Sequence, residues 1–169
     1  LDGAPIAPVS SATGDGIPQF IEELDALCEG VPERGTTGLF RLPVDPVFSM
    51  KGFGTVITGT LISGKVNVGD TIMIYPGKTT SKVRGIQVHN QSAREADAGM
   101  RTAINFQGLD KAAVNRGEVL STPKALVNSY MVDVSFHYLA SNQKPLKNRT
   151  LVRFHTGTSE ILGNLILLE

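Results

Sequence analysis

The chain has 169 residues, of which 41% are hydrophobic and 18 are glycine, and it carries 16 basic and 16 acidic side chains. Such a chain can form one domain or two small ones, and its balanced charge excludes a strongly basic nucleic-acid coat, so any RNA contact must be local. Cys28 is the single cysteine, which excludes an internal disulfide framework, and no apolar run is long enough to span a membrane. We therefore expect a soluble, cytoplasmic protein without a membrane partner. Because the sequence begins at Leu1 rather than at methionine, we also expect it to be a segment of a longer protein.

An amphipathic helix is predicted near the N-terminus, from about Pro18 to Cys28. Apolar side chains recur there with helical spacing, at Ile17, Phe20, Ile21, Leu24 and Leu27. Pro18 suits the first helical turn, where its missing N–H costs nothing, and Gly30 and Pro32 would end the helix.

From Leu39 onward the pattern changes to the two-residue alternation of β-strands. The clearest runs are "TVITGTLI", "DTIMIY", "SKVRGIQVH" and "RTAINF", separated by glycine turns. They predict an antiparallel β-barrel or sandwich in residues 36–123. After a break at "STPKAL", alternation resumes at residues 132–138 and again in "TLVRFH" and "ILGNLILL". These strands predict the N-terminal part of a second β-barrel in residues 124–169, a segment too short to close a barrel.

The stretch "GTLISGKV", Gly59 to Val66, comes within one residue of the phosphate-binding consensus G-x-x-x-x-G-K-[ST]. A working phosphate loop leads into a helix, whereas the residues after Lys65 alternate like a strand, and Val66 replaces the hydroxyl that would hold magnesium. We therefore expect a glycine-containing hairpin that binds no nucleotide. The nearby glycines would then mark bulges, tight corners and close backbone approach, at positions 52, 54, 59, 64 and 69.

Other catalytic patterns are absent from the sequence. There is no Asp-x-x-Gly in a switch context, no Asn-Lys-x-Asp for guanine recognition and no Gly-x-Ser-x-Gly elbow. His89, His137 and His155 lie far apart without the spacing of zinc ligands, and Cys28 falls on or near the apolar helix face. We expect no catalytic residue, no metal site and no cofactor in this segment, and therefore no enzymatic activity of its own.

The strand region resembles the second domain of translational GTPases, and most of all the selenocysteine-specific elongation factors (SelB). The core of the resemblance is "VDPVFSMKGFGTVITGTLISGKVNVGD", and it continues in "VRGIQVHNQ", "ADAGMRTAINFQGL", "VNRGEVL" and "HTGTSEILGNLILLE". It implies that residues 1–34 are the C-terminal end of the GTPase domain with its last helix. Residues 36–123 would form the β-barrel of domain II, and residues 124–169 the truncated first part of the domain III barrel.

The resemblance also implies a binding site. In this family domain II holds the aminoacyl end of the tRNA, in a selenocysteine pocket with an Asp-Arg pair and a further arginine. The aspartate corresponds to Asp45 and the further arginine to Arg101, but Pro46 stands where the pair's arginine is expected. A selenol ionises more readily than a thiol, so a guanidinium at Arg101 oriented by Asp45 would select anionic selenocysteine over neutral serine. From the residues alone, Arg101 also fits a solvated barrel charge and Asp45 a turn residue before Pro46.

Further contacts are implied with less specificity. His89 is a candidate ligand of the aminoacyl end, although a histidine near a strand end also fits a structural role. Lys78, Lys82 and Arg84 are candidate contacts to tRNA phosphates, and a solvated strand face is the alternative. Ser10, Ser11 and Ala12 match the short loop whose backbone touches guanine in the family, although helix capping would explain the same turn.

The function implied for the parent protein is translation elongation. It would bind GTP and Mg²⁺, deliver selenocysteinyl-tRNA to the ribosome at a recoded stop codon, and read a messenger-RNA hairpin through C-terminal domains outside this segment. One alternative is another translational GTPase, such as a Tu-type elongation factor or an initiation factor gamma subunit. A second is a non-catalytic β-barrel interaction module, in which Asp45 and Arg101 would not converge on a common cleft. An unpaired strand edge in "ILGNLILL" predicts some self-association.

Overall fold

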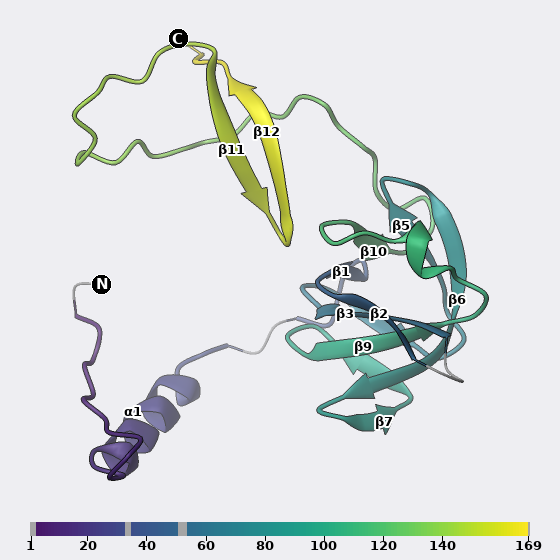
Figure 1. Cartoon of the computed structure of the whole chain (residues 1–169), viewed down its shortest axis with the longest axis horizontal. Coiled ribbons are helices and arrows are strands. Elements are labelled where there is room, and N and C mark those ends of the chain that lie inside the picture. Colours follow the sequence, from purple (N-terminus) through teal and green to yellow (C-terminus); the bar gives the residue numbers. More distant parts are fainter. Residues whose placement is uncertain (1–2, 33–34, 51–53, 169) are drawn as a thin grey trace. The chain divides into compact units, whose positions relative to one another are not determined.

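A computed structural model describes residues 3–32, 35–50 and 54–168 (Figure 1). The chain divides into two compact units, Leu1–Glu33 and Arg34–Glu169. The domain boundary expected at residue 34 and the expected glycine corner at Gly52 lie outside the described residues.

The first unit contains helix α1, Ile17–Glu29, which extends one residue beyond the predicted helix at each end. A proline occupies its first turn, as expected. The residue before the helix is Gly16, in the left-handed conformation with φ 75°, and no side chain caps the helix. The serine and threonine of the preceding turn instead close that turn: the Gly14 N–H donates to the Ser10 carbonyl (2.8 Å), and Thr13 Oγ1 donates to Asp15 Oδ2 (2.7 Å). Helix capping therefore does not explain the turn.

The second unit is built from antiparallel strands, as the two-residue alternation predicts, and the mainly β fold is confirmed. The strands are β1 (Arg41–Pro43), β2 (Val47–Met50), β3 (Gly54–Thr60), β4 (Lys65–Asn67), β5 (Thr71–Tyr75), β6 (Thr79–Val88), β7 (Gln91–Ala93), β8 (Glu95–Asp97), β9 (Arg101–Phe106), β10 (Val119–Ser121), β11 (Thr150–Thr156) and β12 (Ser159–Leu165), with a short 3-10 helix η1 (Lys111–Ala113) before β10. The runs singled out in the sequence correspond to β3, β5, β6, β9, β11 and β12.

One curled sheet forms the body of this unit. Its strand order is β1-β10-β5-β6-β9-β3-β2, with β7 paired to β6, while β4 pairs with β8 and β11 with β12 (Figure 1). The curl returns β1 to the segment after β3, where the Ile62 N–H donates to the Arg41 carbonyl (2.9 Å) and the Arg41 N–H donates to the Ser63 carbonyl (3.1 Å). The enclosed core takes alternate residues of the strands, among them Ile57, Ile72, Ile74, Ile104, Phe106 and Leu120.

The phosphate-loop-like stretch runs from β3 into β4 without any helix, which confirms the expected strand character. The expected hairpin is wrong, because β3 pairs with β2 and β9 whereas β4 pairs with β8. Two of the glycines, Gly59 and Gly64, allow close packing against residues 38–43. A Cβ on Gly59 would overlap the Pro43 carbonyl oxygen, and one on Gly64 (φ 67°) would lie 2.6 Å from the Phe40 nitrogen. The segment therefore crosses between two strand ladders where a side chain at either glycine would collide with the backbone.

The strand expected at residues 132–138 is also wrong. These residues form no strand in the described part of the chain, and the side chains of Val132, Val134, Phe136 and Tyr138 are 40–62% exposed. The only pairing beyond residue 124 in the described ranges joins β11 to β12, from Thr150↔Leu165 to Thr156↔Ser159. Alternation alone does not make a strand, because the backbone groups also need a hydrogen-bonding partner. Within the described ranges, no helix is long and apolar enough to cross a membrane.

Candidate functional site

Asp45 lies in the short connection between β1 and β2, held against β3 by backbone hydrogen bonds. Its N–H donates to the Thr58 carbonyl (2.9 Å), and the Thr58 N–H donates to the Pro46 carbonyl (3.1 Å). The Thr58 hydroxyl donates to the same Pro46 oxygen (3.3 Å). Because proline restricts its own φ and disfavours helical backbone at the preceding residue, Pro46 adds rigidity to this connection. The Asp45 carboxylate therefore projects from a well-anchored backbone.

Two arginines from distant parts of the chain meet this carboxylate. Nη2 of Arg101, the first residue of β9, donates to Asp45 Oδ2 at 3.1 Å. Nε of Arg116, in the turn before β10, lies 3.5 Å from Asp45 Oδ1. The Asp45 side chain is 30% exposed, whereas those of Arg101 and Arg116 are 55% and 72% exposed. The structure thus brings together Asp45 and Arg101, which the sequence analysis had singled out, and adds an arginine that it had missed.

The sequence contained a signal that Arg116 could be functional, but it did not indicate where this residue lies in the fold. Arg116 belongs to "VNRGEVL", one of the strings that resemble the elongation factors, and Gly117 after it has φ 93°, as expected of a turn. No local spacing relates this turn to Asp45, because the two are brought together by the pairing of β1 with β10 and by a hydrogen bond between Val44 and Gly117.

A hollow of about 350 Å³ lies beside Arg101. It is lined by Thr58, Gln87, His89, Asn90, Arg101, Thr102 and Ala103. His89 and Asn90 form the turn between β6 and β7, and both have left-handed backbone, with φ 52° and 62°. The lining therefore presents a guanidinium, an imidazole, hydroxyls and amides. These groups suit a polar or anionic ligand, and the guanidinium supplies charge-assisted hydrogen bonds.

The three predicted phosphate contacts are exposed and do not line this hollow. Lys82 and Arg84 share the exposed face of β6, as predicted. Arg84 sits where the register of β6 with β9 shifts between Val83 and Gly85. Lys78 precedes β6 in a turn with φ 61°, at the opposite end of that 10-residue strand from His89. Because such a strand spans roughly 30 Å, Lys78 is remote from the hollow.

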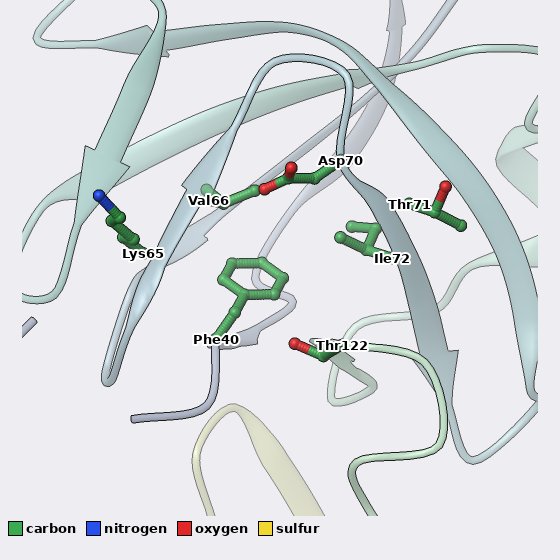
Figure 2. Close-up of a pocket in the computed structure, with 7 residues that line it drawn as sticks. All are labelled: Phe40, Lys65, Val66, Asp70, Thr71, Ile72 and Thr122. Atoms are coloured by element: carbon green, nitrogen blue, oxygen red, sulfur yellow. The ribbon is translucent and has the colours of Figure 1, made fainter. Parts of the chain in front are cut away.

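A second hollow, of about 270 Å³, lies at the glycine-rich stretch (Figure 2). Lys65 and Val66, the last residues of the phosphate-loop-like sequence, line it with Phe40, Ile72 and Asp70. The Asp70 carboxylate accepts hydrogen bonds from the Asn67 N–H (2.8 Å) and from Asn67 Nδ2 (3.3 Å). The Lys65 side chain points away from Phe40 in Figure 2, and its Nζ lies 3.9 Å from Glu95 Oε2. A carboxylate facing this hollow would repel a phosphate, so the geometry does not favour a nucleotide here.

The remaining candidate ligands do not assemble into a site. Among the described residues, no three His, Cys, Asp or Glu side chains are grouped as metal ligands would be. His155 lies on β11 with its Nε2 3.8 Å from Glu160 Oε2, and Cys28 is exposed on α1.

The chain was compared with families of known proteins. Residues 54–121 match the family model described as Elongation factor Tu domain 2. A selenocysteine-specific elongation factor of Desulfomicrobium baculatum is 50% identical over 100% of this chain, which covers 27% of that protein. This chain is a relative of the selenocysteine-specific elongation factors. The expected resemblance is thereby confirmed, and the chain spans about a quarter of the length of that relative.

Two more distant matches also extend over nearly the whole chain. An elongation factor Tu of Streptomyces avermitilis is 28% identical over 99% of this chain and 46% of that protein. The crystal structure of SelB from Methanococcus maripaludis in complex with the GTP analogue GppNHp has a TM-score of 0.79 and 27% identity, over 95% of this chain and 36% of that one. The similarity in sequence is thus greater to the selenocysteine-specific factor than to this Tu-type factor.

Proposed function

We propose that this chain holds the aminoacyl end of selenocysteinyl-tRNA within a translation elongation factor. The observation that carries the proposal is the 3.1 Å contact between Asp45 and Arg101, beside a hollow that Arg101 lines together with His89. Selenocysteine is mostly anionic at neutral pH because a selenol ionises more readily than a thiol, whereas serine is neutral. A guanidinium held in place by a carboxylate would therefore favour the selenocysteine side chain by charge.

The wider proposal concerns the parent protein, of which this chain is one part. The parent would bind GTP and Mg²⁺ in a GTPase domain and would deliver selenocysteinyl-tRNA to the ribosome at a recoded stop codon in the cytoplasm. Other domains would read a messenger-RNA hairpin.

Ser10, Ser11 and Ala12 would touch the guanine of the bound GTP. In their turn, the Ser10 N–H donates to the Asp15 carbonyl (2.9 Å), which holds the loop closed. Hydrolysis of GTP would occur outside this chain.

We propose that Lys78, Lys82 and Arg84 contact tRNA phosphates. Lys82 and Arg84 lie on one exposed face of β6, and Lys78 stands at the start of the same strand. Such contacts carry no sequence information, so replacing Lys82 and Arg84 by glutamine would weaken binding of every aminoacylated RNA by a similar factor. An unchanged affinity for all RNAs would show instead that these charges form a solvated strand face.

The proposed aminoacyl site can be tested by amide spectroscopy of the isotope-labelled chain. The ligands are a short RNA esterified at its 3′ end with selenocysteine, kept reduced, and the same RNA carrying serine. Shifts at Asp45 and Arg101 with the selenocysteine form alone are the expected result. Equal shifts with both forms would favour a barrel of the Tu type, which lacks charge selection. A well-dispersed spectrum without shifts would contradict the proposal.

The interaction-module alternative predicts that Asp45 and Arg101 do not converge on a common cleft. Their ion pair brings the two side chains together, and Arg101, but not Asp45, lines the hollow. Self-association remains a separate proposal, supported by β12, which pairs only with β11 among the described strands and leaves Ile161 and Leu162 at least half exposed. Sedimentation at high protein concentration tests it, and a monomeric mass would refute it.

A further inference from the structure

Two guanidinium groups face a single carboxylate at Asp45. Arg101 meets one carboxylate oxygen at 3.1 Å and Arg116 approaches the other at 3.5 Å. Asp45 and Arg101 alone would form a neutral pair, with little charge left for an anionic ligand. With Arg116 present, the group of three carries one positive charge in excess. Pro46, next to Asp45 in the chain, contributes no charge.

The backbone sets the position of Arg116. The Gly117 N–H donates to the Val44 carbonyl (3.0 Å), and the Val44 N–H donates to the Glu118 carbonyl (2.8 Å). The residues that follow Arg116 are therefore tied to the residue that precedes Asp45. Within the turn, the Glu118 carboxylate accepts a hydrogen bond from the Asn115 N–H (2.8 Å). The Glu118 carboxylate is thus hydrogen-bonded to the backbone of its own turn, and Arg116 forms its ion pair with Asp45.

The atoms used also differ between the two arginines. Arg101 reaches Asp45 through a terminal nitrogen and lines the hollow, whereas Arg116 approaches through Nε and is 72% exposed. A guanidinium has five N–H donors, so an Nε contact leaves the terminal nitrogens of Arg116 outside this ion pair.

From this geometry we infer that Arg116 is a second specificity-determining residue of the site, because its charge offsets that of Asp45 and leaves the charge of Arg101 available to an anionic aminoacyl side chain. The inference rests on the proposed function. Arg116 acts chiefly through Asp45 and Arg101, so its effect should fall on the preference between anionic and neutral ligands rather than on binding of RNA in general.

The test measures the affinity of the whole 169-residue chain for the same two RNAs, esterified with selenocysteine or with serine. Arg116→Gln removes the charge, Arg116→Lys keeps it, and Arg153→Gln is the matched control, since Arg153 forms an exposed ion pair with Glu160 on the hairpin at 2.7 Å. We expect Arg116→Gln to lower the selenocysteine preference about tenfold, because the charge of Asp45 would then be offset by Arg101 alone. Arg116→Lys should retain most of the preference, and Arg153→Gln should leave it unchanged.

The outcomes separate the two proposals. If the unmodified chain prefers selenocysteine and Arg116→Gln keeps that preference, the role of Arg116 is overturned and the proposed function stands. A parallel loss of affinity for both RNAs in Arg116→Gln would also overturn it, because that pattern indicates a phosphate contact. If the unmodified chain binds both RNAs equally, the proposed function fails and the role of Arg116 fails with it. Amide spectra of each variant confirm that the barrel is folded.

Discussion

In the curled sheet, the side chains of Ile57, Ile104 and Leu120 are fully buried, whereas in the β11–β12 hairpin those of Leu151, Phe154 and Ile161 are 45–63% exposed. Both regions contain antiparallel strands with apolar residues. The sheet curls around its apolar inner face, so side chains from different strands pack against one another. The hairpin is a single two-stranded ladder, and no second described layer covers it. The comparison teaches that alternation gives a strand an apolar face, while burial depends on what the fold places opposite.

Hydrogen exchange should show the largest difference between the two regions. Amides of β3, β5 and β9 should open only with global unfolding, whereas those of β11 and β12 should open locally. Because local opening costs far less than global unfolding, protection should differ by roughly a hundredfold or more. Exchange resolved by residue in the intact chain measures this, and similar protection in both regions would break the comparison.

Core truncation should reveal the same contrast in stability. Ile104→Ala in β9 removes a fully buried side chain and should lower the free energy of unfolding by about 2–5 kcal/mol. The matched change Ile161→Ala in β12, at a side chain 50% exposed, should alter it by about 0.5 kcal/mol or less. Denaturant unfolding of both variants provides the measurement. A cost at Ile161 equal to that at Ile104 would mean that the hairpin is covered in solution.

Glycine-to-alanine substitutions compare how closely the backbone is packed in the two regions. Gly64→Ala places a Cβ 2.6 Å from the Phe40 nitrogen in left-handed backbone, so it should destabilise the chain by about 1–3 kcal/mol. Gly163→Ala in β12 meets nothing within 4 Å and should be close to neutral. Thermal unfolding of the two variants tests this, and a neutral Gly64→Ala would argue against the close approach of residues 38–43.

Disrupting ion pairs should have the smallest effect on stability, and this effect should be similar in the two regions. Asp45→Asn weakens ion pairs whose arginine side chains are more than half exposed, and Arg153→Gln removes an exposed pair, so each should lower the free energy of unfolding by no more than about 1 kcal/mol. Chemical denaturation measures both. A larger cost for Asp45→Asn would indicate that the group around Asp45 supports the fold, and would weaken the case that it is kept for binding.

Predictability from sequence differed between elements for a physical reason. The helix and strands β3, β5, β6 and β9 were predicted within two residues at each end, because periodicity of apolar side chains is a local property. The hairpin expected between β3 and β4 failed, since glycine spacing indicates a tight path but not which strand lies beside it. The prediction of a strand at residues 132–138 was wrong because no described segment pairs with these residues.

The candidate site shows the same division. The sequence by itself determined that Gly59 to Val66 leads into a strand rather than a helix, and its resemblance to the elongation factors singled out Asp45, Arg101 and His89. Only the tertiary structure decided that Arg116 also reaches Asp45, because the pairing of β1 with β10 and the hydrogen bonds between Val44 and Gly117 join segments far apart in the chain. Local periodicity specifies how each strand alternates, whereas the path of the chain specifies which charges meet.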